Sequence, residues 1–132
     1  MKLNSFTWWI LRLVPAIILL QTLFYKFSGA EESIWIFTQL GAEPWGRIGS
    51  GIIELIAGLA LLYRPTAWLG SILALGTMGG AIASHLLILG IEIKGDGGQL
   101  FVYALITFFS CLFLLWTDRA KIPFVKGTNS KL

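Results

Sequence analysis

Four ionisable side chains, Arg12, Lys26, Glu54 and His85, interrupt or flank long apolar segments of this 132-residue chain. An ionised group at the centre of a bilayer costs about 2.5 to 3.5 kcal/mol, so groups kept there serve structure or function. An arginine beside a carboxylate keeps that carboxylate ionised, whereas histidine, with an unperturbed pKa of about 6.5, exchanges protons near neutral pH. The chemistry to expect is polar-ligand binding or proton handling inside a membrane.

Arg12 and Glu54 have similar expected depths in the membrane. At about 1.5 Å per residue, Arg12 lies about 9 Å and Glu54 about 13 Å above the inner ends of their segments, so they are expected to be in reach of each other. Pro15 cannot bond to the Leu11 carbonyl, which frees that acceptor for the guanidinium or for water. Two interpretations stay open: a structural ion pair that sets helix register, and a proton-handling or polar-ligand site.

Lys26 and His85 are expected near the outer membrane face, about 28 to 30 Å up and in reach of water. His85 is the better candidate for titration, although a lone histidine near a helix end is more often a packed residue. No metal site is expected, because His85 and the single Cys111 lie on different segments and supply no recognisable ligand set. A single cysteine also excludes a dithiol mechanism, and no catalytic residue is assigned.

The elements that carry these groups are apolar segments of membrane-spanning length. Hydrophobic residues make up 56% of the chain and charged residues 13%, against about 25% in soluble domains. Continuous apolar segments, too few for a closed barrel, must be helices. The first is expected to be a retained helix, since no small-x-small cleavage site follows it. We predict an all-α bundle of four transmembrane helices in one membrane domain, residues 1–132, with spans at about 6–27, 47–63, 66–91 and 99–116.

Basic residues fall mainly on one side of this arrangement. Positive loops stay cytoplasmic, so both termini are predicted to be cytoplasmic, with a basic polar tail at 118–132. The net charge of +3 then reflects sidedness, and no nucleic-acid partner is expected. The inner side holds Lys2, Arg64, Arg119, Lys121, Lys126 and Lys131; the outer side holds Lys26, Arg47 and Lys94.

A short outer helix is expected between the first two spans. Ser28 followed by Glu31 resembles a capping box, and the apolar residues from Ile34 onward coat a helix that ends at Gly41 with Pro44 beyond. It is expected to lie on the membrane surface, either as an inert connector or as a lid over a cavity.

Small residues four apart are expected to let helices approach closely. Gly76, Gly80 and Ser84 form one such line, and Ser50, Glu54 and Gly58 form a comparable line in which Ser50 and Gly58 are small. Whether they face a helix of the same chain or a second copy is left open.

The order of these residues resembles the DoxX family of small four-helix membrane proteins. The resemblance covers about three quarters of the chain. It runs from Arg12 and Lys26 through Phe37, Gly41 and Pro44 to the segment GIIELIAGLALLYRPTAWLGSILALGTMGGAIASH, which contains Glu54, Gly58, Arg64, Met78 and His85. It implies a four-helix bundle in which Arg12, Lys26, Glu54 and His85 occupy the family's characteristic polar positions. Thr22 stands where the family usually has glycine.

The resemblance also implies a function. Some members belong to membrane redox assemblies, including the small subunit of a thiosulfate to quinone oxidoreductase. The hypothesis is a non-catalytic or quinone-side subunit in the bacterial cytoplasmic membrane, bound to another membrane protein or a second copy, with Arg12 and Glu54 lining a head-group pocket and His85 at its outer mouth. The alternative is a module that binds or transports a lipid or small solute, or that chaperones or stabilises another membrane protein.

Overall fold

The computed structural model describes residues 4–119 and 122, and these residues form helices and no strand. Four of the helical segments are long and apolar enough to cross a bilayer: Ser5–Ser28, Trp45–Leu62, Arg64–Leu89 and Gln99–Thr117. The predicted four-helix, all-α membrane fold is confirmed, and the protein is a multi-pass membrane protein. The elements are α1 (Ser5–Ser28), α2 (Glu31–Gln39), α3 (Trp45–Leu62), η1 (Arg64–Thr66), α4 (Ala67–Ser84), η2 (His85–Leu89) and α5 (Gln99–Thr117).

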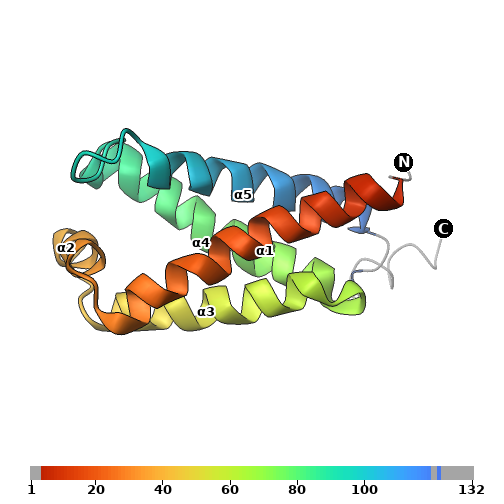
Figure 1. The fold of residues 1–132 in the computed structure, drawn as a ribbon, viewed down its shortest axis with the longest axis horizontal. Helices are drawn as coiled ribbons and strands as arrows, with labels where there is room; N and C mark the ends of the chain where they lie inside the picture. Colours follow the sequence, from red (N-terminus) through yellow and green to blue (C-terminus); the bar gives the residue numbers. More distant parts are fainter. Residues whose placement is uncertain (1–3, 120–121, 123–132) are drawn as a thin grey trace.

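The four long helices pack in a ring of neighbours, because α1 contacts α3 and α5, and α4 contacts α3 and α5 (Figure 1). One end of the bundle holds the start of α1, the η1 turn and the end of α5; we call it the η1 end. The other holds α2 and the 90–98 segment; we call it the α2 end. Of the predicted polar tail, residues 120–121 and 123–132 lie outside the described residues.

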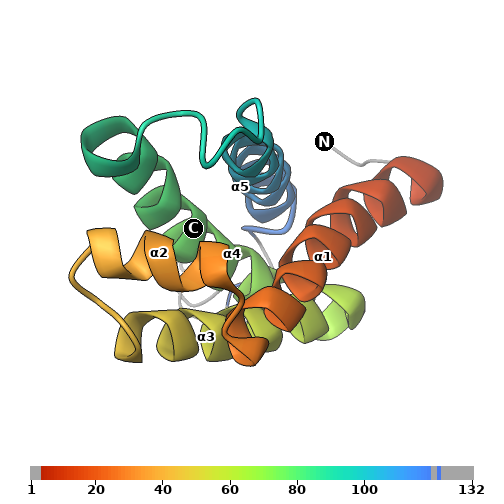
Figure 2. The ribbon, with the colours of Figure 1, turned by 60° about the vertical axis from the view of Figure 1, so that its left-hand side comes forward.

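The short helix α2 lies across one end of the bundle instead of along it (Figure 2). The expected capping box is wrong. Gly29 adopts φ +70°, which ends α1 directly after Ser28, so Ser28 belongs to α1 and only Ala30 is left to start α2. Ala30 makes no side-chain capping bond. The helix itself, predicted to end at Gly41, ends at Gln39.

Close helix contacts form at glycines other than the expected line on α4. A Cβ atom on Gly70 would lie 2.8 Å from the Ala57 carbonyl oxygen and the Leu61 nitrogen, so Gly70 lets α4 touch the backbone of α3. Gly76 and Gly80, by contrast, face no atom within 4 Å. The other expected line, which contains Gly58 on α3, does lie at a helix contact, because Gly58 packs against α1.

α1 and α3 run antiparallel in a register set by packing against glycine. A Cβ atom on Gly58 would come within 2.7 Å of Leu20, and one on Gly51 within 2.8 Å of Phe27. These contacts stagger the two helices, so that Arg12 is level with the last turn of α3. The assumption that the inner ends of both helices lie at one level, which brought Arg12 near the depth of Glu54, is therefore wrong. Leu61 lies seven residues, or about two helical turns, from Glu54 along α3.

Candidate functional site

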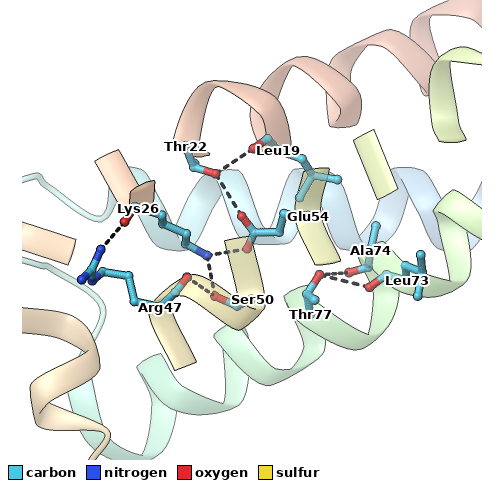
Figure 3. A network of polar contacts seen from close by, with 9 residues as sticks. All are labelled: Leu19, Thr22, Lys26, Arg47, Ser50, Glu54, Leu73, Ala74 and Thr77. Carbon is cyan, nitrogen blue, oxygen red and sulfur yellow. Dashed lines mark hydrogen bonds and ion pairs between the residues drawn. The ribbon is translucent and has the colours of Figure 1, made fainter. Parts of the chain in front are cut away.

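Glu54 is buried between α1 and α3, and its partner is Lys26. Lys26 Nζ lies 2.6 Å from Glu54 Oε1, and the side chains are 16% and 3% exposed (Figure 3). Lys26 sits in the last turn of α1 and reaches back toward mid-helix, as side chains on a helix point toward its N-terminus. Its ammonium also donates to Ser50 Oγ at 3.2 Å. An ion pair with further hydrogen bonds is the form in which buried charges are tolerated.

Thr22 completes the surroundings of the Glu54 carboxylate. Its hydroxyl lies 3.1 Å from Glu54 Oε2 and 2.8 Å from the Leu19 carbonyl (Figure 3). The single hydroxyl proton serves one of these acceptors at a time. Thr22, where the family resemblance would place glycine, thus adds a switchable donor to Glu54.

Arg47, at the start of α3, holds the end of α1 in place. Its Nη1 donates to the Lys26 carbonyl, which fixes the backbone that carries the ammonium (Figure 3). Its Nε donates to both carboxylate oxygens of Glu43, at 2.9 and 3.0 Å. Arg47 is therefore a positioning group for Lys26.

The Lys26–Glu54 pair lines a cavity of about 530 Å³ at the α2 end. Small-molecule sites typically measure about 300 to 1,000 Å³, and this one draws residues from all four spans, from α2 and from the 90–98 segment. Several lining residues in the middle of helices, such as Gln21 and Gly80, are exposed, so the cavity opens toward the membrane-facing surface. Its apolar lining includes Ile18, Leu19, Ile36, Phe37, Met78, Ala81, Leu100 and Ala104.

His85 lies in the same cavity, at the junction of α4 with the π-helical turn η2. Its Nδ1 lies 2.9 Å from the Gly90 carbonyl oxygen, and the Gly90 N–H donates to the His85 carbonyl at 2.7 Å. A carbonyl only accepts, so Nδ1 carries a proton, and in the neutral ring Nε2 is left as an acceptor. His85 is buried and packs against Phe101, so the cavity is its route to water.

Carboxylates outnumber cations in the cavity lining. Glu32, Glu54 and Asp96 line it. Among the described lining residues, Lys26 is the single lysine or arginine. Part of this charge is structural. Burial acts to raise the pKa of Asp96, but four backbone N–H groups hold that pKa below its ordinary value. They belong to Ile93, Gly98, Leu100 and Gln99, around the start of α5.

Arg12, expected beside Glu54, lies at the opposite end of the bundle. Its Nε donates to the Leu61 carbonyl at 2.7 Å, and its guanidinium lies over the rings of Trp8 and Trp9, at 4.1 and 4.5 Å. The carbonyl that it uses belongs to the last turn of α3 and not to Leu11. The structure thus brings Lys26, Glu54 and His85 to one cavity and separates Arg12 from them, because of the stagger of α1 on α3.

Sequence reasoning overlooked Thr22 as a Glu54 partner and Arg47 as a positioning group. Glu43 and Arg47 are four apart, the spacing at which helical side chains pair, and this signal was available. No local signal links Thr22 to Glu54, since their contact depends on the register of two helices. Comparison of the chain with protein-family models, with curated proteins and with solved structures gave no match.

Proposed function

We propose that this membrane protein binds a neutral amphipathic molecule of the quinone class in the cavity at the α2 end. The observation that carries the proposal is the buried Lys26–Glu54 pair in the wall of a 530 Å³ cavity that is otherwise largely apolar. A few polar groups placed in an apolar cavity fix the orientation of a bound ligand.

The polar groups of the cavity suit a quinone or quinol head group. Two of the three protons of the Lys26 ammonium are used by Glu54 and Ser50, and the third is available to a carbonyl oxygen. His85 Nε2 is an acceptor for a hydroxyl, and a donor when the ring is charged. The excess of carboxylates disfavours an anionic ligand, whereas a quinone is uncharged.

Within this proposal the chain is a DoxX-family protein and the non-catalytic, quinone-side subunit of a membrane redox assembly. The positions of Lys26, Glu54 and His85 around one cavity support the assignment, since the resemblance makes them characteristic polar positions. Its partner would be another membrane protein or a second copy. The proposed location is the bacterial cytoplasmic membrane, with the η1 end on the cytoplasmic side, because the sequence carries more Lys and Arg in the segments predicted to be inside.

The test is the identity of small molecules that co-purify with the protein in a mild detergent. Gly80 lines the cavity and Gly76, one turn away, does not, while neither has an atom within 4 Å of an added Cβ. Gly80→Leu should therefore fill the cavity and reduce bound quinone by about tenfold or more, with Gly76→Leu as the matched control. Glu54→Gln should also lose the quinone.

Mass spectrometry of the extracted ligands separates the outcomes. Quinone retained by the wild type and by Gly76→Leu, but lost from Gly80→Leu, supports the proposal. Equal retention in Gly80→Leu would place the quinone elsewhere and overturn it. A phospholipid or other solute in place of quinone, lost in the same variant, would favour the lipid- or solute-binding alternative.

A further inference from the structure

Arg12 carries hydrogen-bond donors that nothing in the described part of the chain satisfies. Its side chain is completely buried, and only Nε has a hydrogen-bond partner, the Leu61 carbonyl. Nη1 and Nη2 are both buried without one. Buried polar groups in proteins are nearly always hydrogen-bonded, and a charged group left short of partners is the most costly exception. The Arg12 guanidinium can therefore donate further hydrogen bonds to an acceptor from outside the described residues.

A second guanidinium lies on the same aromatic ring. Arg64 is 4.6 Å from the centroid of the Trp8 ring, and Arg12 is 4.1 Å from that centroid. Arg64 and Asp118 both act electrostatically on Arg12, the first repelling and the second attracting. The two guanidinium groups that share the Trp8 ring therefore place two positive charges close to each other.

The group lies at the ends of the membrane-spanning segments, where lipid phosphates are expected. Arg12 is level with the last turn of α3, and Arg64 belongs to the turn that follows it, so both lie where the bundle reaches the membrane boundary. Trp8 and Trp9 are at this level, as tryptophans at interfaces usually are. Arg64 is exposed and Trp9 is 45% exposed, so the groups that cover the Arg12 guanidinium are surface side chains.

We propose that Arg12 and Arg64 bind the phosphate of a phospholipid head group at the η1 end. A lipid phosphodiester carries one negative charge, which would offset the repulsion between the two guanidinium groups, and its oxygens match the paired donors of a guanidinium. The acyl chains would lie along the lipid-facing side of α1. This site is separate from the cavity at the α2 end, and the proposal does not depend on the ligand of that cavity.

Native mass spectrometry of the detergent-solubilised full chain tests the proposal, with phosphatidylglycerol as the added lipid. Diacylglycerol, which lacks the phosphate, and inorganic phosphate are added in separate titrations. The wild type should retain one phosphatidylglycerol, and Arg64→Gln and Arg12→Gln should each weaken this binding by about tenfold. Arg119→Gln is the matched control, because Arg119 stacks on Trp116 at the same end of the bundle and donates to the Trp116 carbonyl.

Arg64→Gln keeps the test decisive if Arg12→Gln fails to fold, because Arg64 is an exposed residue of the turn. Binding that both Arg12→Gln and Arg64→Gln leave unchanged would overturn the proposal. Equal binding of diacylglycerol would also overturn it, since the acyl chains alone would then hold the lipid. Inorganic phosphate that binds as tightly as the lipid would overturn the lipid as the source.

Discussion

The two ends of the bundle bury charge in different ways. At the α2 end, Glu54 is paired with Lys26 and accepts a hydrogen bond from a hydroxyl, beside a cavity whose lining includes two further carboxylates. At the η1 end, Arg12 is hydrogen-bonded to no carboxylate of the described residues and lies against two indole rings and the carboxyl end of α3. Both solutions stabilise a charge away from water, the first by pairing and the second by aromatic faces and the negative end of a helix dipole.

This difference predicts which ligands each end selects. The α2 end has open space and more carboxylates than cations, so it favours an uncharged or cationic head group. The η1 end has cations and closely packed backbones, so it favours an anion at its rim. The two proposed sites therefore differ in the charge of the head group that each would bind.

Removal of Glu54 should have the largest effect on stability. Glu54→Leu leaves the Lys26 ammonium partly buried without its carboxylate, and loss of one partner of a buried pair costs about 3 to 5 kcal/mol. The double variant Lys26→Met with Glu54→Leu should recover most of this loss, because no charge is left unpaired. Unfolding in detergent, followed by circular dichroism, measures both. Additive losses in the double variant would contradict the pairing.

Glycine-to-alanine substitutions at two places in α4 should have different effects on stability, because α4 packs closely on α3 at Gly70 and borders the cavity at Gly80. In Gly70→Ala the new methyl group meets the backbone of α3 at 2.8 Å, and overpacking of this kind costs about 1 to 3 kcal/mol. Gly80→Ala meets nothing within 4 Å and replaces a poor helix former, so it should be neutral or stabilising by up to about 1 kcal/mol. Unfolding midpoints of the two variants provide the comparison, and similar midpoints would refute the difference in packing.

Removal of the Thr22 hydroxyl should have a smaller effect, specific to the α2 end. Thr22→Val takes away the donor at Glu54 Oε2 and should cost about 1 to 2 kcal/mol. Thr77→Val is the control. Its hydroxyl also lies at the cavity, but it bonds only to the carbonyls of Leu73 and Ala74 in its own helix. Equal unfolding midpoints for the two variants would show that Thr22 contributes nothing to Glu54.

Acid should remove a small stabilisation from the 90–98 segment. The pKa of Asp96 is lowered in the folded protein, so its ionised form stabilises the fold above the unfolded pKa of about 3.9. This contribution disappears as the pH falls through the lower, folded pKa. The difference in melting temperature between the wild type and Asp96→Asn should therefore be constant near neutral pH and shrink below about pH 4. A difference that does not change with pH would exclude this role.

The amino-acid sequence by itself determined the four spans and the short helix between the first two. Each observed span begins and ends within two residues of its predicted bounds. These features depend only on local composition, because the length of an apolar segment must match the thickness of the bilayer and backbone groups in lipid must bond within their own helix. The third span ends at Leu89, two residues before its predicted end, where the π-helical turn closes on Gly90 with φ +83°.

Tertiary structure alone decided which buried charges meet. The depth of each residue along its helix predicted that Arg12 is the neighbour of Glu54. This prediction assumed that the inner ends of the two helices lie at one level. The fit of Leu20 against Gly58 and of Phe27 against Gly51 instead staggers α1 on α3, so Lys26 and Thr22 reach Glu54 and Arg12 reaches Leu61. Helix register depends on which side chain fits against which glycine across the contact, and no pattern within a single helix contains that information.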